Sequence, residues 1–112
     1  MATVMAARIY QGIPATSEAA LFTATVPYVI TSIHASGDAT GGSLSLSVVP
    51  SGGTAAAANR IAQAFPVAAA ASVDVLPAGS TIAMRPGDFI SGLQSAGTHV
   101  TLTITADAYG HA

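Results

Sequence analysis

Polar and apolar residues alternate along several stretches of the chain, and this period of two is typical of half-buried β-strands. The clearest case is residues 97–109, where every second residue from Val100 to Ala106 is apolar and the residues between them are threonines. Residues 43–49, SLSLSVV, repeat the pattern, with serines on the face expected to point outward. Both stretches predict antiparallel strands with one face in the core and one in solvent.

Further strands are predicted with less regular alternation. A third strand is expected over residues 27–36, with Ile33 as a core anchor. The weaker candidates are residues 6–11, 19–25, 66–76, 80–85 and 88–93. The one helical candidate is residues 55–63, AAAANRIAQ, which could equally be an extended connection between two sheets.

Turn sequences separate these candidate strands. They are GDATGG at 37–42, PSGGT at 50–54, LPAGS at 76–80 and RPGD at 85–88. In the last, Pro86 presets the first central φ, and Gly87 supplies the positive φ that a type II turn needs. The side chains of Asp38 and Asp88 are expected to cap their turns. Short strands joined by such turns predict an all-β fold, an antiparallel β-sandwich or jelly-roll-like arrangement of about seven or eight strands.

The chain of 112 residues is expected to form one domain. Periodicity is weak over the first part of the chain, so residues 1–20 are predicted to be an extended N-terminal arm or an edge segment. Residues 21–112 are then the sandwich itself.

Charge is unusually scarce: 7% of the residues are charged, and the formal net charge is −2, against about 25% charged residues in an ordinary soluble domain. The surface must therefore consist of Ser, Thr, Ala and Gly. Such a surface favours association, and it lacks the lysines that usually guard strand edges. We expect a homo-oligomer, a trimer or a dimer.

Several classes of partner are excluded by composition. Without lysine, the three arginines, Arg8, Arg60 and Arg85, are scattered and form no basic patch for nucleic acid. Without cysteine there is no disulfide and no thiolate metal site. Prolines and glycines interrupt every long uncharged span, so no membrane helix is expected. The N-terminal sequence does not resemble a signal peptide.

No catalytic, cofactor or metal site is expected, and the chain is predicted not to be an enzyme. His34, His99 and His111 lack the further ligands that a metal site needs. The acidic residues form no glycosidase pair, and no serine lies in a nucleophile elbow. A single aspartate at 37–42 is too little ligand charge for calcium.

The polar and aromatic side chains expected on the surface are the best candidates for contacts between subunits. The candidate interface residues are Arg8, Tyr10, Gln11, Tyr28, His34, His99 and Tyr109. A different hypothesis is glycan binding through the loops at 37–42, 50–54 and 94–98, involving Tyr28 and Asp38. The scarcity of aromatic residues, at 5% with no tryptophan, argues against a flat carbohydrate platform.

Four segments, taken in their order along the chain, resemble a group of small structural proteins of tailed bacteriophages. They are RIYQGIPATSEAALFTA at 8–24, VITSIHASG at 29–37, LSLSVVPSGGTAAAANRI at 44–61 and RPGDFISGLQSAGTHVTLTI at 85–104. One departure is ATVPY at 24–28, where that group has a glycine-bearing turn.

The resemblance implies a component of the virion exterior, made in the host cytoplasm. It implies a head decoration or minor capsid protein that binds the major capsid protein or other virion proteins. The alternative that it leaves open is a tail or head-appendage subunit that binds a glycan on the host surface.

Overall fold

The computed structural model describes residues 2–54, 59–77, 79–95 and 97–111. Within these residues the chain forms strands and turns, with no α-helix. The strands are β1 (Ala2–Gly12), β2 (Ala19–Thr23), β3 (Tyr28–Gly37), β4 (Gly42–Val49), β5 (Arg60–Val67), β6 (Ser72–Asp74), β7 (Ile82–Met84), β8 (Phe89–Gln94) and β9 (Val100–His111).

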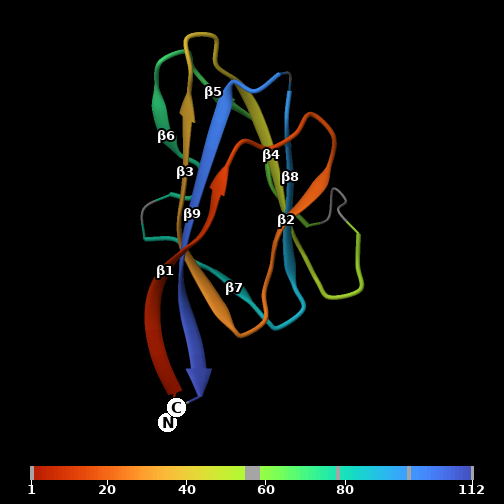
Figure 1. The fold of residues 1–112 in the computed structure, drawn as a ribbon, viewed down its shortest axis with the longest axis vertical. Helices are drawn as coiled ribbons and strands as arrows, with labels where there is room; N and C mark the ends of the chain where they lie inside the picture. The colour runs from red at the N-terminus through yellow and green to blue at the C-terminus, as the bar shows by residue number, and fades with distance from the viewer. Residues whose placement is uncertain (1, 55–58, 78, 96, 112) are drawn as a thin grey trace.

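The strands make two antiparallel sheets packed face to face (Figure 1). Sheet A has the order β1-β9-β3-β6, and β7 pairs with the other end of β3; sheet B has the order β2-β8-β4-β5. Successive strands alternate between the sheets except at β4–β5 and β6–β7. The all-β antiparallel sandwich predicted from the sequence is therefore confirmed.

The core lies between the sheets and comes from the alternating positions of the sequence. In β9, Val100, Leu102, Ile104 and Ala106 are all fully buried, and so is Ile33 of β3, as predicted. Leu44, Leu46 and Ile90 fill the facing side of sheet B. Since burying one such side chain contributes about 1.5–3 kcal/mol, this two-sided apolar layer provides the main stabilisation of the sandwich.

Two predictions from the alanine-rich middle of the chain are wrong. The helix predicted over 55–63 is not formed, because Arg60–Val67 is a strand. The first part of that prediction, residues 55–58, lies outside the described residues. The predicted strand at 66–76 is two strands separated by a turn at 68–71, in which Ala70 has φ 54°. A run of alanines has no polar–apolar period that could mark the turn. The turn is held instead by a distant part of the backbone, since the Ala70 N–H donates to the Asp38 carbonyl oxygen at 2.6 Å.

Ser45 and Ser47 of β4 occupy the predicted outer face, but they do not lie in solvent, whereas Ser43 is half-buried. Ser45 is 8% exposed and Ser47 is 0% exposed. The Ser45 hydroxyl accepts a hydrogen bond at 2.9 Å from the N–H of Ala64, at a bulge in β5 where Ala64 has φ 48°. The bulge at Ala64 meets Ser45, and Arg60, paired with Glu18, lies opposite Ser47. The sequence pattern of β4 alone could not indicate these contacts.

Residues 2–12 form β1, an edge strand that pairs antiparallel with β9 along its length. The chain then crosses to sheet B through residues 13–18. The N- and C-termini lie close together at one end of the molecule (Figure 1). That residues 1–20 act as an arm that grips a neighbouring subunit stays a prediction.

Candidate assembly surfaces

The described part of the chain contains no pocket, and within it no three His, Asp or Glu side chains gather to hold a metal ion. No helix in these residues is long and apolar enough to cross a membrane. The features that remain are a polar network at one end of the sandwich, an ion pair over sheet B, and the edges of the two sheets.

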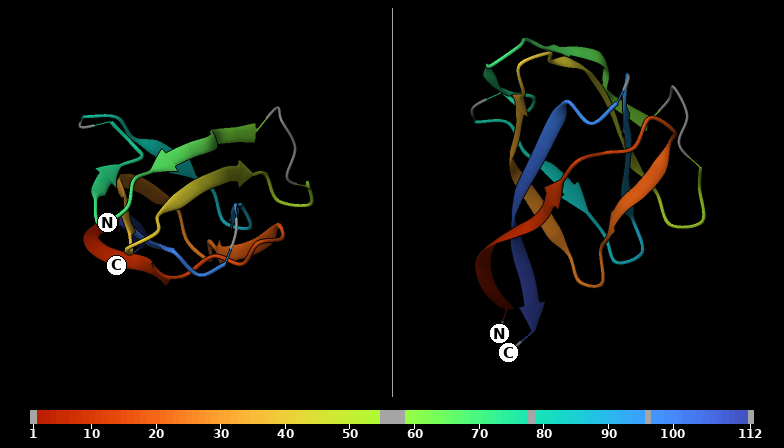
Figure 2. Two further views of the ribbon diagram at one scale, coloured as in Figure 1. Left: turned by 90° about the horizontal axis from the view of Figure 1, so that it is seen from above. Right: turned by 45° about the horizontal axis from the view of Figure 1, so that its top comes forward.

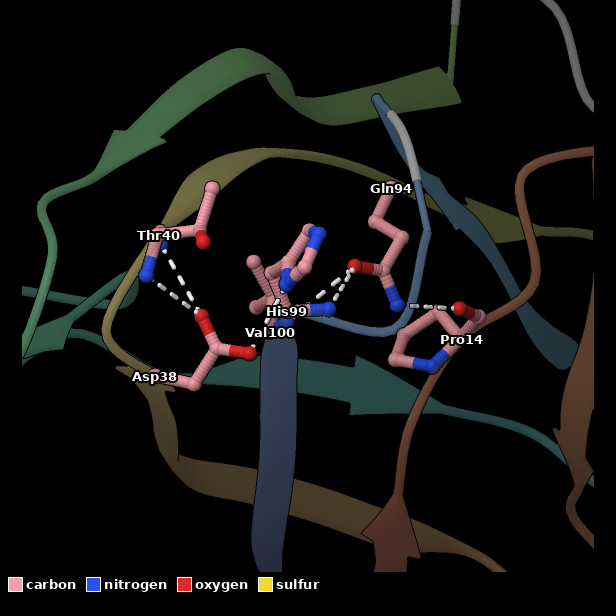
Figure 3. A network of polar contacts seen from close by, with 7 residues as sticks. Pro14, Asp38, Thr40, Gln94, His99 and Val100 are labelled. Carbon is pink, nitrogen blue, oxygen red and sulfur yellow. Dashed lines mark hydrogen bonds and ion pairs between the residues drawn. The ribbon is translucent and has the colours of Figure 1, made fainter.

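Gln94, the last residue of β8, is the centre of the polar network (Figure 3). Its side chain is buried at 1% exposure. The Oε1 atom accepts the N–H groups of His99 at 3.0 Å and Val100 at 3.1 Å, and Nε2 donates to the carbonyl oxygen of Pro14. One amide therefore joins the crossing between β1 and β2 to the loop between β8 and β9.

Asp38 and His99 lie beside this amide (Figure 3). Asp38 Oδ1 accepts the N–H groups of Thr40 at 2.8 Å and Gly41 at 3.1 Å, which confirms the predicted turn cap. Its Oδ2 atom is 2.7 Å from His99 Nδ1. The hydrogen bond from His99, followed by those from the two backbone N–H groups, lowers the pKa of Asp38 to about 2. The carboxylate thus holds the turn against the start of β9.

Asp38→Asn is expected to reduce stability at neutral pH and to flatten its dependence on acid. A lowered pKa means that the Asp38 carboxylate stabilises the fold fully above its ordinary pKa of 3.8, and that this stabilisation disappears as the pH falls through about 2. Thermal unfolding followed by circular dichroism from pH 7 to pH 2 measures both chains. A difference in Tm that stays constant down to pH 2 would contradict the role given to this carboxylate.

An ion pair crosses the outer face of sheet B. Arg60 Nη1 of β5 lies 3.0 Å from Glu18 Oε1, just before β2, and these two strands are the opposite edges of the sheet. The hydroxyl of Ser91 in β8 donates to Glu18 Oε2 at 2.7 Å. Ser47, the register partner of both Arg60 and Ser91, lies between them. This arrangement could not be predicted from the sequence, because no local pattern links Glu18 to Arg60.

The candidate interface residues are spread over the molecule and do not form one patch. Arg8 and Gln11 are exposed on β1, while Tyr10 is half-buried against the core, and burial raises its pKa. Tyr109 lies in β9 opposite Val4. Tyr28, at the start of β3, packs edge-on against Phe22 with ring centroids 5.3 Å apart.

The two interface histidines each pair with an aspartate. His34 Nδ1 lies 3.1 Å from Asp74 Oδ1, between β3 and β6, and His99 pairs with Asp38 as described above. Both pairs lie near the end of β3 that is farthest from Tyr28. The part that any of these residues plays in an interface stays a prediction.

The three loops considered for glycan binding do not meet. Residues 37–42 lie beside 94–98, joined through the Asp38–His99 contact. Residues 50–54 follow the other end of β4, where the N–H of Ser51 donates to Asp88 at 3.1 Å. Tyr28 begins the ten-residue β3 and Asp38 follows its last residue, so at about 3.3 Å per residue they are roughly 30 Å apart. A single glycan site built from all of these parts is therefore not formed.

The four sheet edges differ in how well they could accept another strand. β1 and β2 lie along one side of the sandwich, and β5 and β6 along the other (Figure 2). β1 is an eleven-residue edge that contains no proline and one charged residue, Arg8. β5 contains Pro66 and a bulge, and β6 and β7 have three residues each. β1 and β2 also contain register shifts, between Arg8 and Tyr10 and between Ala20 and Phe22. β1 nevertheless keeps a regular register over Ala2–Arg8 and contains no proline, so it is the edge with the longest uninterrupted stretch for strand pairing.

No family model and no curated protein matches this chain. Among solved structures, the fold resembles a chain from work described as "Bacillus endospore appendages form a novel family of disulfide-linked pili". The TM-score is 0.60 at 16% sequence identity, and the alignment covers 100% of this chain and 92% of the other. The sandwich is thus similar in fold to a structural protein of a surface appendage. The resemblance to bacteriophage proteins read from the sequence motifs stays a prediction.

Proposed function

We propose that this protein is a non-enzymatic structural subunit that assembles with copies of itself in an appendage or particle exposed outside a cell. The observation that carries the proposal is the long, nearly uncharged β1 edge on an otherwise charge-poor sandwich. Similarity in fold to a pilus protein supports it. The absence of a pocket and of a metal cluster among the described residues leaves contact with other subunits as the better-supported mode of action.

Assembly of this chain cannot use disulfide bonds, because the chain contains no cysteine. The pili of the structural neighbour are described as disulfide-linked. We expect oligomers that grow with protein concentration, that dissociate in moderate urea, and that do not respond to reducing agent. Light scattering and negative-stain electron microscopy, with and without dithiothreitol, measure this. A protein that remains monomeric up to millimolar concentration would refute the proposed function.

Within this class, the order of four sequence motifs favours a bacteriophage head decoration or minor capsid protein. These motifs are residues 8–24, 29–37, 44–61 and 85–104. Such a protein stabilises a shell because it binds only the assembled state. The test is co-sedimentation of the purified chain with empty phage heads, compared with a chain that lacks residues 2–20. Circular dichroism must show whether the shortened chain still folds, since β1 belongs to sheet A. Binding to tail tips or host glycans, without binding to heads, would favour the appendage alternative.

A further inference from the structure

We propose that the β1 edge is the surface on which a second copy of this chain docks, and that the resulting contact is a two-fold dimer. This inference rests on the proposed function and makes it more specific, because it names the surface and the symmetry. In the dimer, the β1 strands of two copies pair antiparallel and join the two A sheets into one continuous sheet.

The β1 edge is open, and its register is regular from Ala2 to Arg8, before a shift between Arg8 and Tyr10. On one side β1 pairs with β9, from Ala2 opposite His111 to Gly12 opposite Leu102. On its other side sheet A ends, so a row of backbone N–H and C=O groups faces outward. Proteins that remain monomeric guard such edges with lysine, proline or short strands. β1 has no lysine and no proline, and its regular part, Ala2–Arg8, is long enough for a second strand to pair with it.

The β5 edge is closed to such pairing by Pro66. Its register partner Ser43 uses both backbone groups on the β8 side: the Ser43 N–H donates to Ser95 Oγ at 3.1 Å, and its carbonyl accepts the Ser95 N–H at 2.9 Å. Backbone groups alternate in direction along an antiparallel pair, so the nitrogen of Pro66 faces the open edge, where it has no hydrogen to donate.

The bulge at Ala64 disrupts the same edge. The Ala64 N–H turns to the Ser45 hydroxyl at 2.9 Å, and a second register shift falls between Leu46 and Ser47. An incoming strand would therefore meet neither a regular row of donors nor a straight backbone along β5.

The remaining edge of sheet A is interrupted. β6 pairs with residues 34–36 of β3, and β7 pairs with residues 28–30. Between them, the N–H of Val75 donates to the Ile33 carbonyl at 2.8 Å before the chain leaves the sheet. Three-residue strands are too short to template another strand.

The closed edges determine the symmetry. A head-to-tail contact would need an open edge on each side of the sandwich, whereas β1 and β2 lie on the same side (Figure 2). Pairing through the same patch on both copies is isologous, and it closes after two subunits. The dimer would then be the unit from which a larger structure is built through other surfaces.

Two lysine variants test the choice of edge. Ala6→Lys places a positive charge in the middle of β1. The register partner of residue 6 in β9 is Asp107, so the added lysine has a negative charge beside it within the same chain and the fold should tolerate it. In a two-fold contact centred on the middle of β1, the new lysine lies close to the new lysine or to Arg8 of the other copy, and like charges in such a contact are strongly unfavourable. Gln63→Lys, an exposed position on β5, is the matched control. Circular dichroism confirms that each variant is folded.

Light scattering and sedimentation across a concentration series are expected to show a dimer at low concentration for the original chain and for Gln63→Lys, with larger assemblies of dimers as the concentration rises. For Ala6→Lys we expect a dissociation constant raised by about tenfold or more, which corresponds to about 1.4 kcal/mol. If Gln63→Lys is weakened instead, or if neither variant is, the β1 assignment is wrong while the proposed self-assembly stands. If the original chain is monomeric throughout, the proposed function itself fails. An oligomer with an odd number of subunits, such as a trimer, that Ala6→Lys disperses to monomers would overturn the two-fold symmetry.

Discussion

Replacing Gly41 with alanine is expected to lower the free energy of unfolding by about 3–5 kcal/mol, or to prevent folding. Gly41 is buried and has φ 71°, in the left-handed region. A Cβ atom there would lie 2.6 Å from the Val67 carbonyl oxygen and 2.7 Å from the Ala69 nitrogen. Both are backbone atoms of the turn after β5, so neither can move aside as a side chain could.

Gly52→Ala is the matched control for this substitution. Gly52 also has a positive φ, of 80°, but its added Cβ would meet no atom within 4 Å. It should therefore show only the conformational cost of about 1–2 kcal/mol. Urea unfolding followed by far-UV circular dichroism measures both variants. Equal losses for the two would show that the close approach of residues 37–42 to residues 67–70 does not limit stability.

Gln94→Met is expected to lower the free energy of unfolding by about 3 kcal/mol or more. Methionine nearly preserves the volume of the side chain but removes its hydrogen bonds to His99, Val100 and Pro14. Each buried polar group left without a partner costs about 1–3 kcal/mol. The loop before β9 and the crossing after β1 would then lose the side-chain amide that joins them.

Gln63→Met provides the comparison for Gln94, because the same change is made at an exposed position of β5. It should alter stability by no more than about 0.5 kcal/mol. Hydrogen exchange at the His99 and Val100 amides gives a second, local measurement. If these amides remain as protected in Gln94→Met as in the original chain, the side chain of Gln94 is not what orders the loop.

The elements that could be predicted from the sequence are those whose information is local. β9 shows a strict alternation over its first seven residues, and its apolar positions are buried as expected because period two forces them to one face. The turn at 85–88 has the positive φ at Gly87, 94°, that its proline and glycine predict. The caps by Asp38 and Asp88 also follow from short-range chemistry, since Asp88 accepts the Arg85 N–H at 2.9 Å.

The errors fall where local information is weak. Alanine has little preference for a strand over a turn, so the boundary between β5 and β6 was set by contacts with residues 37–42. A tendency to self-associate could be inferred from composition alone, whereas the choice of β1 as the open edge could not. That choice depends on which strands end each sheet and on the direction in which the Pro66 nitrogen points.

For this protein the sequence by itself determined the fold class, the main strands and the charge-poor surface, because alternation, turn residues and composition act over a few neighbouring positions. Only the tertiary structure decided which residues act together. Gln94 reaches Pro14 across 80 positions, and Asp38 meets His99 across 61. The physical reason is that strand order brings such residues together, and no short-range preference encodes that order.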